Sequence, residues 1–177
     1  SLTTKSALSD PGKVARVSLG SFSRKKVDVS LAGKLSAGDG GDYFLAASHF
    51  DESGWRDYSD GNVSNFFGKA SKNTDFGSVG VMAYLGDSDL LGNGLLPSTN
   101  YGVEDNVGEI HENGLYEASR ESVYSHPDQT KNEVGLISLN FQNYIDDDTL
   151  VNGLVYSRYG RQKRLGGDVE AEFESDE

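Results

Sequence analysis

Residues 26–35 alternate strictly between polar and apolar side chains. The apolar positions are Val27, Val29, Leu31 and Leu35, and the polar positions are Lys26, Asp28, Ser30 and Lys34. A period of two belongs to an extended strand, because a helix brings side chains back to the same face every 3.6 residues. The segment therefore predicts a β-strand with one face in an apolar environment and the other in water.

Similar segments recur along the chain, and residues that favour turns separate them. The pattern predicts strands over residues 13–20, 26–35, 43–50, 64–71, 76–85, 134–144 and 149–160. Their lengths are close to the ~9–11 residues that a tilted strand needs to cross a bilayer. We therefore expect an all-β protein that forms an antiparallel up-and-down meander of about seven strands.

The connections between these strands alternate between short and long. The short ones are 36–42, 72–75 and 145–148, the long ones are 51–63 and 86–131, and the short link 20–25 is the exception. In an antiparallel meander every second connection lies at the same end of the sheet. A loop as long as 86–131 is unusual in a compact soluble domain but common on the outer side of outer-membrane barrels. The pattern therefore favours a transmembrane β-barrel.

Composition limits the function classes that this chain can serve. The mean hydropathy is -0.52, and no apolar run approaches the ~18 residues of a spanning helix. A barrel keeps its mean hydropathy low because only alternate residues meet lipid. The formal net charge of -12 argues against nucleic acid as a partner, because no basic stripe could neutralise the phosphates.

The residue types that carry catalysis or metal binding are missing or scattered. The chain has no cysteine, and His49, His111 and His126 share no spacing suited to metal ligation. There is no nucleophile elbow, no zinc-type histidine pair and no phosphate loop. We therefore expect neither an enzyme nor a metal site, and no cofactor.

Several short segments carry a family resemblance. Residues 2–5 (LTTK) resemble the last plug strand of TonB-dependent outer-membrane receptors, and residues 20–24 (GSFSR) resemble the tip between the first two barrel strands. Residues 43–46 (YFLA) and 50–57 (FDESGWRD) resemble the third strand and the loop after it. Residues 91–97 (LGNGLLP) and 123–128 (VYSHPD) are similar to loop sequences of one branch of these receptors. The resemblance spans essentially the whole chain and keeps the family's order.

The resemblance implies that this chain is a fragment of a larger fold. Members of the family have a TonB box and a globular plug, followed by a barrel of 22 strands. Residues 1–10 then correspond to the end of the plug, and residues 11–177 to the N-terminal part of the barrel. We expect an incomplete part of a transmembrane barrel whose unpaired edge strands would be prone to aggregate in water.

The function that the resemblance implies is active import across the outer membrane of a Gram-negative bacterium. In the family, a scarce ligand such as a ferric siderophore binds between plug and loops. TonB then pulls on the plug and draws on the proton gradient of the inner membrane. The implied partners are this ligand, the TonB complex, and membrane lipid with lipopolysaccharide.

Ligand contacts are expected in the long loops, which would face outward. The candidates are Trp55, Arg56, Tyr101, Arg120, Tyr124 and His126. Aromatic side chains would stack on the ligand, and arginines would pair with its carboxylate or catecholate oxygens. The acids of the loop 86–131 lack the fixed spacing of a calcium-binding loop, so we interpret them as a solvated surface.

A soluble or secreted all-β binding module, such as a carbohydrate-binding or adhesin-like sandwich, is the alternative. Low hydropathy and acidic charge support it. The two hypotheses differ in what lies against the apolar faces of the strands. A sandwich buries these faces in its own core, whereas a barrel segment presents them to lipid.

Overall fold

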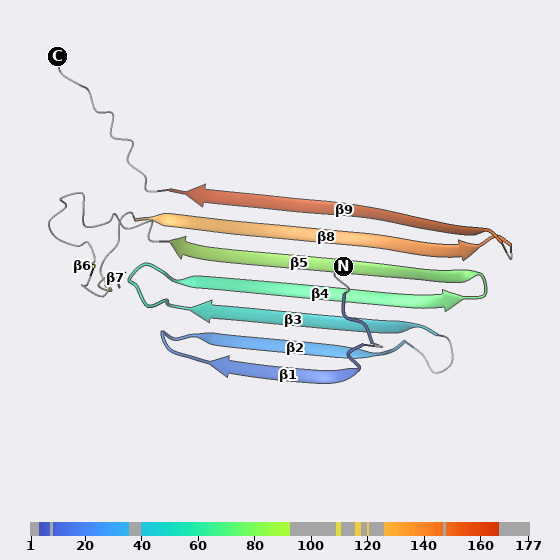
Figure 1. Ribbon diagram of the computed structural model, residues 1–177, viewed down its shortest axis with the longest axis horizontal. Helices are drawn as coiled ribbons and strands as arrows, with labels where there is room; N and C mark the ends of the chain where they lie inside the picture. Colours follow the sequence, from blue (N-terminus) through green and yellow to red (C-terminus); the bar gives the residue numbers. More distant parts are fainter. Residues whose placement is uncertain are drawn as a thin grey trace, which may run out of the picture.

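The computed structural model describes residues 4–7, 9–35, 40–92, 109–110, 116–117, 120, 126–146 and 148–166. They form one sheet of seven strands and one of two (Figure 1). The large sheet contains β1 (Gly12–Leu19), β2 (Lys25–Lys34), β3 (Asp42–Glu52), β4 (Gly61–Thr74), β5 (Gly77–Gly92), β8 (Asp128–Tyr144) and β9 (Leu150–Leu165). The small sheet pairs β6 (Glu109–Ile110) with β7 (Tyr116–Glu117). The described residues contain no helix that could cross a membrane.

The strands of the large sheet follow one another in chain order, β1-β2-β3-β4-β5-β8-β9. Every neighbouring pair is antiparallel, so the connections alternate between the two ends of the sheet (Figure 1). The turn end carries the connections 35–41, 75–76 and 145–149, and the loop end carries 20–24, 53–60 and 93–127. The predicted all-β class and the seven-stranded antiparallel meander are thus confirmed.

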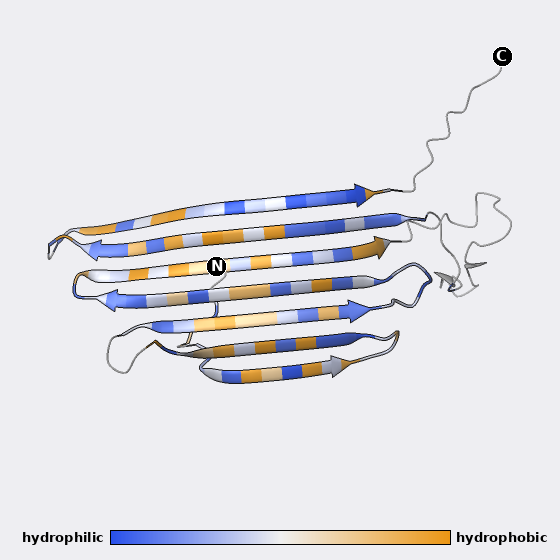
Figure 2. Ribbon diagram, turned by 180° about the vertical axis from the view of Figure 1, so that it is seen from behind, coloured by the Kyte–Doolittle hydropathy of each residue, from blue (hydrophilic) through white to orange (hydrophobic). Residues whose placement is uncertain are grey.

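The ladder register assigns each side chain of the large sheet to one of two faces, because paired residues share a face. The apolar face holds Val29, Ala47, Phe66, Leu85, Val81, Ile137, Leu139, Phe141, Val155 and Tyr159. The polar face holds Arg16, Lys26, Asp28, Asn65, Ser88, Asn132, Ser138 and Asn140, with Phe44, Phe67 and Tyr84 near its middle. Figure 2 shows hydrophobic and hydrophilic residues alternating along the strands.

Burial in this sheet is the reverse of that in a water-soluble domain. On the apolar face, Leu85 is 58% exposed and Tyr159 is 55% exposed. Phe44 and Ala32, both on the polar face, are the buried hydrophobic residues in the described part of the chain. The described strands form a single layer, so the apolar side chains have no second layer of this part to pack against (Figure 1).

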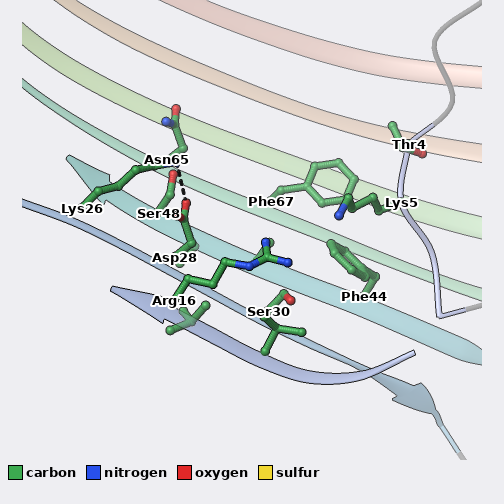
Figure 3. Close-up of a pocket in the computed structure, with 14 residues that line it drawn as sticks. Thr4, Lys5, Arg16, Lys26, Asp28, Ser30, Phe44, Ser48, Asn65 and Phe67 are labelled. Atoms are coloured by element: carbon green, nitrogen blue, oxygen red, sulfur yellow. Dashed lines mark ion pairs between the residues drawn. The ribbon is translucent and has the colours of Figure 1, made fainter. Parts of the chain in front are cut away.

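The N-terminal residues lie against the polar face. Nζ of Lys69 donates a hydrogen bond to Oγ1 of Thr4 at 3.3 Å, and Thr4 and Lys5 lie near Phe44 and Phe67 (Figure 3). A groove of about 470 Å³ separates this segment from the sheet. Hydrogen bonds from Lys5 and then from Ser9 hold the pKa of Asp10 below its usual range. The segment is therefore folded back over the sheet and held there by polar contacts.

Several strands extend further toward the loop end than the sequence predicted. β4 begins at Gly61 rather than 64, β5 ends at Gly92 rather than 85, β8 begins at Asp128 rather than 134, and β9 ends at Leu165 rather than 160. The expected loops 51–63 and 86–131 are correspondingly shorter, at 53–60 and 93–127.

The reason for the difference is that both faces are polar near the loop end. Ser88 pairs with Asn132 on one face and Asp89 pairs with Lys131 on the other, so the ladder continues while the alternation of hydropathy stops. Figure 2 shows the resulting hydrophilic stretches at the loop ends of β8 and β9.

Candidate ligand site at the loop end

The connection between β3 and β4, residues 53–60, folds into a compact loop that positions two of the predicted ligand contacts. Gly54 has φ +73°, and a side chain there would overlap the Ser59 hydroxyl. Oγ of Ser59 donates to the carbonyl oxygen of Arg56 at 2.6 Å. This local hydrogen bond holds the backbone around Trp55 and Arg56, so that both side chains have a defined position.

On one side, this loop is attached to the β1–β2 connection. The backbone N–H of Ser53 donates to the carbonyl oxygen of Phe22 at 3.0 Å. The guanidinium of Arg24 makes two hydrogen bonds to the Glu52 carboxylate, at 2.9 and 3.1 Å. Its Cζ also lies 5.9 Å from the centre of the Phe50 ring. The bidentate pair neutralises Glu52 and keeps this carboxylate at the edge of the site.

On the other side, the same loop is attached to the β5–β8 connection. Nε of Arg120 donates to Oδ1 of Asp57 at 2.9 Å, and the N–H of Asp57 donates to the carbonyl oxygen of Arg120 at 3.0 Å. The ring centres of Tyr58 and His126 lie 4.0 Å apart, and the angle between the ring planes is 32°. We call these two residue pairs, Asp57–Arg120 and Tyr58–His126, the loop clasp, because each joins segments more than sixty positions apart in the chain.

A hollow of about 450 Å³ lies beside this loop, at the loop end of the polar face. Its lining includes Phe50, Glu52, Trp55, Arg56, Leu90 and Leu91. Cζ of Arg56 lies 5.2 Å from the centre of the Trp55 ring. Nε of Arg56 is shielded from solvent and has no hydrogen-bond partner among the residues that the structure describes. The hollow thus combines apolar walls with a guanidinium donor that is left unsatisfied.

These features favour a ligand with an anionic oxygen and an apolar or aromatic surface. A shielded charged donor without a partner costs more than about 1–3 kcal/mol, and an oxyanion of a ligand would remove that cost. Since Arg24 already neutralises Glu52, the positive charge of Arg56 remains available. No group of three potential metal ligands occurs in the described part of the chain.

The structure brings together four of the residues that the sequence singled out. Trp55 and Arg56 line the hollow, while Arg120 and His126 belong to the loop clasp. The candidates Tyr101 and Tyr124 lie outside the described residues.

Sequence reasoning missed Asp57 and Tyr58, the partners of Arg120 and His126, and the Arg24–Glu52 pair at the edge of the hollow. The position of Asp57 and Tyr58 directly after Trp55 and Arg56 in one polar loop was the available signal. The pairing itself could not be read from the chain, because the two members of each pair lie far apart in the sequence.

Comparisons with known proteins add no identification. No protein-family model matches the chain, and no curated protein or solved structure is significantly similar to it.

Proposed function

We propose that this chain is part of a TonB-dependent receptor, an outer-membrane β-barrel that imports a scarce ligand such as a ferric siderophore. The observation that carries the proposal is the sidedness of the sheet. Its apolar face is exposed, while its polar face lies under the N-terminal residues. A transmembrane barrel has this arrangement, with lipid outside and a polar lumen inside.

The apolar face needs surroundings other than water. Leu85, Ile137, Leu139 and Val155 are all exposed, and burying one such side chain fully is worth about 1.5–3 kcal/mol. A bilayer supplies that burial for every strand at once. β5 and β9 have 16 residues each, more than the ~9–11 that span the hydrocarbon core. Their hydrophilic loop ends would therefore project beyond it.

The edges of the sheet support further strands in the assembled barrel. β1 and β9 each have one edge without a partner strand among the described residues. Hydrocarbon cannot accommodate such an edge, because unpaired N–H and C=O groups cost several kcal/mol each. We therefore infer further strands that close the sheet into a barrel. The family resemblance sets their number at 22, with residues 11–177 as the N-terminal part of the barrel and residues 1–10 as the end of the plug.

The proposed import needs no covalent chemistry in this chain. The hollow beside Arg56 and Trp55 would receive the ligand from outside, with Arg56 paired to a carboxylate or catecholate oxygen. The TonB complex would then act on the plug, of which residues 1–10 are the last part. Membrane lipid and lipopolysaccharide would surround the apolar face.

A soluble sandwich is the competing hypothesis, and the single layer of strands counts against it. A sandwich places a second sheet about 10 Å from the first, so that the inner faces bury each other. In the described ranges, no second sheet faces the apolar residues of the large one.

Labelling at two consecutive residues of β9 tests the membrane proposal. Leu154 and Val155 are 64% and 65% exposed but lie on opposite faces. In full-length protein reconstituted in vesicles, we expect lipid-borne spin labels to quench a fluorophore on Val155→Cys. The same fluorophore on Leu154→Cys should respond to a water-soluble quencher instead. Equal quenching by lipid at both positions would contradict the proposal.

Import is tested separately in cells. Expression of the full-length gene product should raise uptake of iron from a ferric siderophore in a strain that lacks its own receptors. Removal of TonB should abolish that gain. Uptake that persists without TonB would contradict active import and would indicate a passive channel.

A further inference from the structure

Charged side chains interrupt the apolar face at its loop end. On the three strands β5, β8 and β9 they are Asp87, Asp89, Lys131, Glu133, Arg161 and Lys163. The register sets Asp87, Glu133 and Arg161 in one row and Asp89, Lys131 and Lys163 in the next. We call this group the charged rim. It begins one row beyond Leu85, Gly135 and Tyr159, where the apolar face ends.

Positive charge gathers on the β9 side of the charged rim. Nζ of Lys131 lies 2.7 Å from Oδ2 of Asp89, so these two charges compensate each other. Arg161 and Lys163 are exposed and make no ion pair with any residue that the structure describes. β9 carries no acidic residue over its whole length. The positive charge of the charged rim that forms no ion pair therefore lies at the loop end of β9, with Asp87 and Glu133 in the row of Arg161.

The charged rim also has a shape that could receive such a group. A cavity of about 230 Å³ lies among Asp87, Asp89, Lys131, Glu133, Arg161 and Lys163. On β9, Tyr159 is the next residue on this face toward the turn end, and it is followed on the same face by Ser157 and then Val155. Successive residues of one face are about 7 Å apart. A ligand with an anionic head and an apolar chain would thus meet the charged cavity with its head and the neighbouring apolar residues with its chain.

We propose that the charged rim binds the phosphorylated headgroup of an outer-leaflet lipid. The phosphate would sit between Arg161 and Lys163, and the acyl chain would lie against Tyr159 and Val155. Guanidinium groups pair with phosphate through two parallel hydrogen bonds, and an ammonium adds a point charge beside it. The proposal rests on the function proposed above, because it places the apolar face in lipid.

Native mass spectrometry of the full-length protein, extracted from vesicles that contain a phosphorylated lipid A, tests this inference. The test variant is Arg161→Gln/Lys163→Gln. The matched control is Arg158→Gln/Arg164→Gln, which removes the same charge from the same strand but on the polar face. We expect the test variant to lower lipid retention about tenfold, as the loss of charge-assisted hydrogen bonds predicts. The control should retain the lipid like the unaltered protein.

Further arms separate the possible outcomes. Dephosphorylated lipid A should be retained weakly by every variant, and inorganic phosphate should not displace the phosphorylated lipid. Equal loss in test and control variants, or equal retention of the dephosphorylated lipid, would overturn the proposal. Displacement by inorganic phosphate would indicate a free-anion site and overturn it as well. The quenching at Val155→Cys stays independent of these results, so the membrane proposal can hold while this one fails.

Discussion

Ser138 and Leu139 are consecutive residues of β8, yet the serine is 8% exposed and the leucine is 46% exposed. In a water-soluble domain this order would be reversed, because burial of leucine drives folding and burial of serine does not. The contrast is not local to β8. Leu139 pairs with Val81 on β5 and with Val155 on β9, and both valines are exposed as well.

A charge on the apolar face should destabilise the protein far more than a charge on the polar face. Leu139→Arg should cost about 2–4 kcal/mol of unfolding free energy in vesicles, because the guanidinium would lie in hydrocarbon. Asn140→Arg, one residue along, should cost much less, since Asn140 lies on the polar face. Urea unfolding in vesicles measures both. Equal costs at the two positions would contradict the proposal that lipid covers the apolar face.

Gly77 should not tolerate a side chain. It has φ +152°, and a Cβ there would overlap the carbonyl oxygen of Gln142 on β8. Gly77→Ala should therefore destabilise the sheet by about 1–3 kcal/mol or more through backbone strain. At Gly160 a Cβ would meet nothing within 4 Å, so Gly160→Ala serves as the control and should leave the unfolding midpoint nearly unchanged.

Arg56 should govern ligand affinity. Arg56→Gln removes the positive charge but keeps a polar side chain, and we expect the half-saturating concentration of a ferric catecholate siderophore to rise about tenfold or more. Lys25→Gln removes the same charge at the loop end, on the apolar face and away from the hollow, and should leave uptake unchanged. Equal losses in the two variants would indicate a general electrostatic effect.

The loop clasp should control loop order rather than global stability. Arg120 and Asp57 are both substantially exposed, so Asp57→Asn should change the unfolding free energy by less than about 1 kcal/mol. Cleavage of the 93–127 connection by added protease should nevertheless become faster. Asp60→Asn in the same loop is the control, and the exchange Asp57→Arg/Arg120→Asp should slow cleavage again.

The turn after β8 should weaken only in acid. A hydrogen bond from the Thr149 side chain, and then one from the backbone N–H of Asp148, hold the pKa of Asp146 below the usual 3.8. The stabilisation is therefore present above pH 3.8 and is lost as the pH falls through the lowered value. Carboxyl NMR should show Asp146 titrating below 3.8. Thr149→Val should raise this pKa, and Thr149→Ser should leave it low.

The sequence predicted the meander because alternation was strong wherever one face is apolar. It missed the outer parts of β5 and β8, since Asp89 and Lys131 pair there without any contrast between the two faces. In the candidate site, Trp55 and Arg56 stood out as ligand-contacting residue types. The loop clasp could not be predicted, because the contact of Asp57 with Arg120 depends on how two distant connections fold.

The strands of the large sheet lie side by side in chain order, and this order limits how such a sheet can grow or shrink. Each inner strand of the large sheet pairs with the strand before it and the strand after it in that sheet, so a hairpin can be added or removed while the other pairings persist. A single added strand would move every later loop to the turn end and every later turn to the loop end. Growth by duplication is therefore restricted to pairs of strands, which keeps every elaborated loop at the loop end of the sheet.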